Sequence, residues 1–91
     1  MTPTEILVAT RALIAEPEHW CQKQSQHTLG RTIQRCLSYA LECVGGDIAE
    51  VTLAYAAIAQ HVEIGLVHFN DTHTHAEVIG LLDQVIAENQ T

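Results

Sequence analysis

The chain has 91 residues, 47% of them hydrophobic, so it is long enough for one domain with a thin core and too short for a multidomain enzyme. Four Lys and Arg residues stand against eleven Asp and Glu residues, which gives a formal net charge of −7. All four basic residues lie in positions 1–35, and the eight carboxylates of residues 36–91 would repel phosphate backbones, which argues against direct nucleic-acid binding.

The first half of the chain predicts two helices joined by a long loop. Thr2-Pro3-Thr4-Glu5 is typical of a helix start, because Thr caps, Pro fits the first helical position and Glu reaches back to the cap. Apolar residues at helical spacing then predict a helix over residues 3–15. Residues 16–30 form a long loop that holds the only tryptophan. We expect Trp20 to cover the open end of the helix layer as a lid on the core, with ligand contact as the alternative.

An apolar stripe from Ile33 to Val44 predicts the second helix, over residues 31–44, which Gly45-Gly46 would end. A third helix is predicted from Asp47 to about Val62, and it is apolar on nearly all sides. Such a helix is either central or at an interface. Ile48, Val51, Tyr55, Ile58 and Val62 recur in it at heptad spacing.

Residues 65–74 are expected to form a second loop, because Gly65 interrupts a short stretch rich in β-branched residues. Thr74 and Glu77 then repeat the capping signature of the first helix and predict a last helix over residues 75–89. No segment is predicted to be a strand. The predicted fold is therefore an all-α, compact four-helix single domain spanning residues 1–91, with a long loop between the first and second helices.

The cysteines and the apolar segments bear on location. The three cysteines, an odd number, suit free thiols in a reducing compartment, and no apolar segment reaches the length of a membrane span. We therefore expect a cytoplasmic protein that does not bind membranes. Cys21 is the only thiol in a loop, but a reactive pair with His19 would also need an oriented base and an oxyanion site, and the sequence identifies neither.

Four short motifs are spread along the chain. They are Trp20-Cys21-Gln22, Arg35-Cys36 followed by Ala40-Leu41, Phe69-Asn70-Asp71, and Thr74 followed by Val78 and Leu82-Asp83. From about Leu7 to Ile86, this pattern resembles a family of small uncharacterised proteins of bacteria and their phages. That family, a domain of unknown function, shows Trp…Cys-x-x-Gly-Ala-Leu…Trp-Asn-Asp…Thr-x-x-x-Val…Leu-Asp.

The chain departs from the family pattern at three positions, with Lys23 in place of Gly, Tyr39 in place of Gly and Phe69 in place of Trp. The resemblance implies a shared helical fold and a phage or mobile-element origin. It implies no chemistry.

The motif residues Trp20, Phe69, Asn70 and Asp71 are the candidate binding residues. A structural role also explains the Asn70-Asp71 turn, since Asn and Asp side chains bond to nearby backbone in turns. Phe69 would anchor this loop in the core. A buried Asn70 would fix the loop rather than react.

An alternative is a metal site, because four potential ligands, His68, Asp71, His73 and His75, lie within eight positions. Imidazole and carboxylate groups suit zinc and similar ions. Their spacing matches no metal-binding template, however, and exposed or capping histidines are the favoured interpretation. No catalytic residues and no cofactor are predicted.

The expected function is that of a non-enzymatic, acidic protein-binding module. Charged residues make up only 16% of the chain, so we expect apolar surface to be covered by a second copy, as in a homodimer, or by a basic partner protein. The resemblance to phage proteins implies an inhibitor or regulator of a host or defence protein. The alternative is a metal- or small-ligand-binding protein that uses the His68–His75 loop.

Overall fold

Five α-helices, a short 3-10 helix and a two-stranded hairpin follow one another along residues 1–90, which the computed structural model describes. In chain order they are α1 (Pro3–Leu13), η1 (Pro17–His19), β1 (Gln26–Leu29), β2 (Thr32–Arg35), α2 (Leu37–Val44), α3 (Ile48–Ala59), α4 (Leu66–Thr72) and α5 (His75–Asn89). The prediction of an all-α, four-helix fold is therefore wrong, because the structure combines helices with a small antiparallel sheet.

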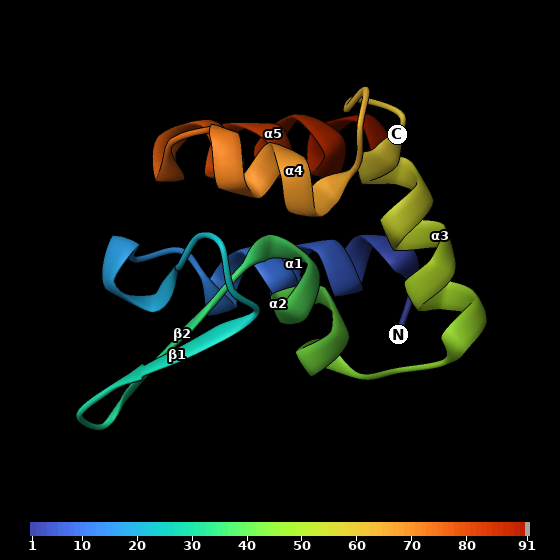
Figure 1. The fold of residues 1–91 in the computed structure, drawn as a ribbon. Coiled ribbons are helices and arrows are strands. Elements are labelled where there is room, and N and C mark those ends of the chain that lie inside the picture. The colour runs from blue at the N-terminus through green and yellow to red at the C-terminus, as the bar shows by residue number, and fades with distance from the viewer. Residues whose placement is uncertain (91) are drawn as a thin grey trace.

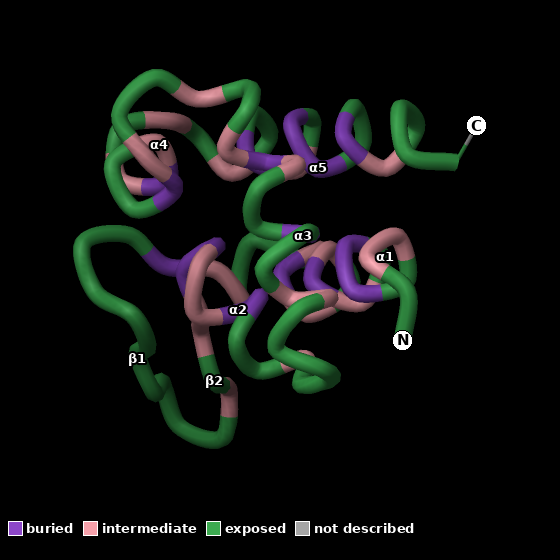
Figure 2. The backbone as a smooth tube through the Cα atoms, turned by 90° about the vertical axis from the view of Figure 1, so that its right-hand side faces the viewer, coloured by how far each residue is buried: buried purple, intermediate pink, exposed green. Residues whose placement is uncertain are grey.

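The helices form two layers around one core. Helices α4 and α5 lie over α1 and α2, α3 closes one side, and the hairpin projects from the opposite side (Figure 1). The buried stretches face each other between the layers, whereas the hairpin is largely exposed (Figure 2). The core cluster draws on all five helices and consists of Ile6, Leu7, Ile14, Leu37, Ala40, Leu41, Ala54, Ile58, Leu66, Val78, Leu81, Leu82 and Val85.

The first and last helices begin as the sequence predicts. The Thr2 hydroxyl accepts the Glu5 amide at 3.1 Å while the Glu5 carboxylate accepts the Thr2 amide at 2.8 Å. Thr74 and Glu77 form the same reciprocal pair at the start of α5. These hydrogen bonds stabilise the ionised carboxylates and lower the pKa of Glu77 below its ordinary value.

Among the described helices, none is long and apolar enough to cross a membrane.

The predicted helix over residues 31–44 begins only at Leu37, because the four residues Thr32–Arg35 form β2 instead. This strand pairs antiparallel with β1, from Gln26 opposite Arg35 to Leu29 opposite Thr32. The two-residue turn between them places Gly30 at φ +65°, a conformation that glycine adopts without steric cost, and Gly is the preferred first residue of a type II′ turn. Ile33 fits the helical spacing of the apolar residues that follow it. The strand with which it pairs, β1, comes before it in the chain.

The predicted loop over residues 65–74 contains a helix, α4, of seven residues. Gly65 precedes it with φ +134°, and no side chain caps it. The helix is held instead by its buried residues, Leu66 and Asn70. Because it lacks both a capping residue and a long periodic pattern, nothing local in the sequence signals it.

Candidate functional site

Asn70 lies at the centre of a buried hydrogen-bond network. Its side chain is fully buried, and its Oδ1 accepts the indole N–H of Trp20 at 2.6 Å and the amide of Leu37 at 3.0 Å. Its Nδ2 donates to the carbonyl of Cys21 at 2.9 Å and to Oδ1 of Asp71 at 3.3 Å. Both lone pairs and both hydrogens of the amide are therefore used within the protein, as expected for a residue that fixes a loop.

One of these bonds also caps a helix. Leu37 is the first residue of α2, and the amides of a first helical turn have no partner within their own helix. Asn70, which is far away in sequence, supplies that partner, while the Sγ of Cys36 accepts the amide of Tyr39 at 3.4 Å. The network thus joins the start of α2 to α4.

The segment Trp20–Lys23 extends this hydrogen-bond network along the end of α4. Gln22 donates to the carbonyls of Asn70 at 3.1 Å and His73 at 2.8 Å. The amide of Lys23 donates to Oδ1 of Asp71 at 2.6 Å. The first and third family-like motifs, Trp20-Cys21-Gln22 and Phe69-Asn70-Asp71, are therefore two halves of one structural clamp.

Lys23 has φ +65° and is, within the described residues, the one non-glycine residue with a positive φ. A side chain in this left-handed conformation crowds the backbone, whereas glycine adopts it freely. In the pattern that the chain resembles, Gly stands at this position. The departure therefore falls at a position where the backbone itself favours glycine, and the hydrogen bond that the Lys23 amide donates to Asp71 helps to hold this conformation.

Trp20 packs half-buried against the core cluster, with its ring 5.5 Å from that of His75. Such packing suits the predicted lid on the core. His75 in turn donates from Nε2 to the carbonyl of Ile14 at 2.7 Å. The side chains of Trp20 and His75 thus face inward and engage partners within the protein.

Three of the four candidate metal ligands bond to different partners within the protein. Asp71 accepts backbone and side-chain N–H groups, His75 reaches Ile14, and His73 bonds to the carbonyl of Phe69. Within residues 1–90, no three His, Cys, Asp or Glu side chains are arranged to hold a metal ion. These residues are close together in the sequence, but their side chains do not converge on one metal position.

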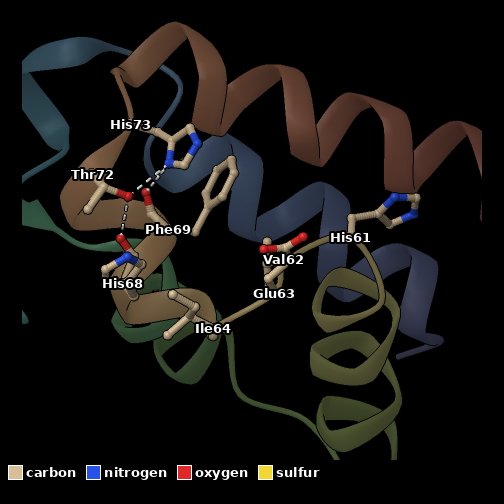
Figure 3. A pocket seen from close by; sticks show the side chains of 9 residues that line it. His61, Val62, Glu63, Ile64, His68, Phe69, Thr72 and His73 are labelled. Carbon is tan, nitrogen blue, oxygen red and sulfur yellow. Dashed lines mark hydrogen bonds between the residues drawn. The ribbon is translucent and has the colours of Figure 1, made fainter.

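A hollow of about 290 Å³ opens beside α4 and is lined by His61, Val62, Glu63, Ile64, Gly65, His68, Phe69, Thr72 and His73 (Figure 3). The ring of His73 stacks on Phe69, with centroids 3.8 Å apart. A carbonyl only accepts, so the 2.9 Å contact to Phe69 O places a proton on Nδ1 of His73. In the neutral ring, Nε2 is then left as an acceptor.

The loop cysteine is a buried thiol. Cys21 is 7% exposed, and its Sγ lies 3.5 Å from the carbonyl of Gln24. Burial raises the pKa of Cys21 above its ordinary value, so the thiol form dominates at neutral pH. The burial and the pKa both oppose a reactive thiolate at this position.

Three large, exposed apolar or aromatic side chains, Ile48, Leu53 and Tyr55, lie on α3. Only Ala54 and Ile58 of this helix are buried, whereas Ile48 and Tyr55, which share the heptad spacing of Ile58, are 83% and 44% exposed. Leu53 is 59% exposed. We call the solvent-facing side of this helix the α3 face, defined by Ile48, Ala49, Thr52, Leu53, Tyr55 and Ala56.

The α3 face carries no charged residue. Its members span roughly 160° of the helix circumference at about 100° per residue. Of its two hydroxyls, on Thr52 and Tyr55, that of Thr52 donates back to the carbonyl of Ile48 at 2.7 Å. The charged residue of α3, Glu50, is half-buried on another side and pairs with the amino group of Met1 at 3.1 Å. The sequence indicated an all-round apolar helix here but not which side faces solvent.

Comparison with known proteins gives one result. A family model described as a family of unknown function, DUF6197, matches residues 1–88. No curated protein and no solved structure matches the chain.

Proposed function

The chain belongs to the DUF6197 family, a family of unknown function, and from that premise we propose that it binds another protein through the α3 face. The observation that carries this proposal is the uncharged, largely apolar side of α3, with Ile48 83% and Leu53 59% exposed. Single exposed apolar residues are common on protein surfaces, but a contiguous group marks an interaction site.

The character of α3 supports the same conclusion. A helix that is apolar on nearly all sides belongs either in the centre of a fold or at an interface. In this fold α3 lies at one side of the layers (Figure 1), and this position supports an interface role. Binding, rather than catalysis, is then the proposed activity, and inhibition or regulation of a host or defence protein is one form it would take.

Affinity capture from a bacterial lysate tests the proposal when matched variants are compared. Leu53→Asp places a charge on the α3 face, whereas Leu29→Asp does the same on the hairpin, at a leucine that is 63% exposed. We expect Leu53→Asp to lose proteins that the wild-type chain and Leu29→Asp both retain. Circular dichroism should show that both variants remain folded, and equal capture by all three would contradict the proposal.

A second candidate function is binding of a small ligand in the hollow beside α4. It is favoured by the convergence of His68, His73 and Phe69 on a space of about 290 Å³, close to the lower end of the range of about 300–1,000 Å³ for ligand pockets. Ligand-observed NMR with a fragment library tests it. Hits should disappear with His73→Ala and persist with Leu53→Asp.

A further inference from the structure

Two hollows flank the α3 face. The α2 hollow, of about 260 Å³, lies between α2 and α3 and is lined by Ser38, Leu41, Glu42, Val51, Thr52 and Tyr55. The α5 hollow, of about 320 Å³, lies on the other side of α3 and is lined by Pro3, Leu53, Ala56, Ala57, Gln60, Glu88 and Asn89. The α3 face is therefore a ridge between two grooves, the shape into which the side-chain ridges of another helix pack.

A carboxylate stands in each hollow. Glu42 is exposed at the edge of the α2 hollow, and Glu88, which pairs with His61 at 2.7 Å, lines the α5 hollow. Asp47 caps the exposed start of α3 and adds a third negative charge. Residues 36–91 contain no Lys or Arg, and beside this surface the amino group of Met1 pairs with Glu50 while the imidazole of His61 pairs with Glu88.

This charge pattern distinguishes the possible occupants. In a two-fold pair, each copy presents the same patch, so a second copy would bring the carboxylates of both rims together. Like charges facing each other across an interface oppose association. A partner with Lys or Arg flanking an apolar stripe would instead match both the apolar centre and the acidic rim.

The arrangement of the hollows, one on each side of α3, favours the side chains of a partner helix as their occupants. An amphipathic helix offers apolar side chains at positions i, i+3, i+4 and i+7, which suits a ridge flanked by grooves. We propose that the occupant of the α3 face is a basic amphipathic helix of a partner protein, an inference that rests on the proposed function. Its apolar side chains enter the two hollows, and its Lys or Arg side chains pair with Glu42 and Glu88.

A pair of synthetic peptides tests this proposal. The first, of about 18 residues, has leucine at helical spacing with lysine elsewhere, and the second has glutamate in place of every lysine. Fluorescence anisotropy of labelled peptide measures binding to the full chain. We expect the lysine peptide to bind, the glutamate peptide to bind at least about tenfold more weakly, and added salt to reduce the difference.

Protein variants locate the binding. Glu42→Lys should weaken the lysine peptide about two- to fivefold and strengthen the glutamate peptide, as expected for an exposed ion pair. Glu18→Lys, on η1 at the opposite side of the molecule (Figure 1), is the matched control and should change each affinity less than Glu42→Lys does. Leu53→Asp should weaken the lysine peptide about tenfold or more, as for a central contact.

The outcomes separate this proposal from the proposed function. Equal binding of both peptides, binding of neither, or equal effects of Glu42→Lys and Glu18→Lys would overturn the basic helix. A dimer in sedimentation analysis that Leu53→Asp disperses would also overturn it, because a second copy would then occupy the face, while protein binding by the α3 face would stand. Lysate capture that is indifferent to Leu53→Asp would refute the proposed function itself.

Discussion

Replacing Asn70 by alanine removes the residue that joins three segments of the chain. The carbonyl of Cys21 and the amide of Leu37 lose their hydrogen-bond partner in the interior, and the half-buried indole N–H of Trp20 loses its own. A buried polar group without a partner costs about 1–3 kcal/mol. Two such groups and the indole together predict a loss of about 3–5 kcal/mol in the free energy of unfolding.

That loss is large for a chain of this length. At about 0.05–0.15 kcal/mol per residue, a domain of this size has an unfolding free energy of about 5–14 kcal/mol. The Asn70→Ala protein should therefore be folded but much less resistant to urea. Trp20→Phe removes one donor and leaves Oδ1 of Asn70 bonded to Leu37, so it should cost only about 1 kcal/mol.

Urea unfolding followed by far-ultraviolet circular dichroism measures both variants on the same scale. Asn89→Ala is the control, because its side chain makes a single bond, to the carbonyl of Val85, at the exposed end of α5. It should change stability by about 0.5 kcal/mol or less. If Asn70→Ala costs no more than Asn89→Ala, the buried network does not hold the clamp together.

Three further predictions concern single positions. Thr74→Ala should lower the unfolding free energy by about 1 kcal/mol, whereas Thr72→Ala, whose exposed hydroxyl bonds to the carbonyl of His68, should do little; equal losses in urea would place the start of α5 wrongly. Lys23→Gly should be about 0.5–1 kcal/mol more stable than Lys23→Ala, because glycine relieves the positive φ, and equal midpoints would exclude strain there. The lowered pKa of Glu77 means that its contribution is present above the ordinary value of 4.5 and is lost as pH falls through the lowered folded value. The stability curves of wild type and Glu77→Gln against pH should therefore converge in acid, and a constant gap would contradict this linkage.

The parts of the fold that the sequence predicts well are those with local chemical signals. The last helix was predicted over residues 75–89 and runs from His75 to Asn89, because Thr74 and Glu77 satisfy each other across one turn. Ile6 and Leu7, two of the apolar residues at helical spacing in the first helix, are likewise fully buried. In each case the information lies within a few residues of the element itself.

The errors arose where distant segments decide the structure. The β1–β2 hairpin depends on pairing between strands, and Ile33 happens to fit the helical period of Cys36 and Leu37. The helix α4 has no side-chain cap of its own and depends on burial of Leu66 and Asn70. The exposed side of α3 could not be predicted either, because in a helix that is apolar on all sides the hydrophobic pattern does not identify the side that contacts the core.

The candidate binding residues were recognisable as a group but not as a clamp. The sequence indicated that a buried Asn70 would fix a loop, and the side chain is fully buried with four internal contacts. Its partners, Trp20, Cys21 and Leu37, come from two segments more than thirty positions away. Periodicity and capping rules do not reach across such a separation.

Amide hydrogen exchange tests most directly whether the α3 face binds protein. The chain is compared alone and in complex with the partner that wild-type capture retains and Leu53→Asp does not. We expect slower exchange to centre on Ile48–Ala59, with the β1–β2 hairpin unchanged. Slower exchange confined to the hairpin or to α4, with α3 unaffected, would contradict the α3 face as the binding surface.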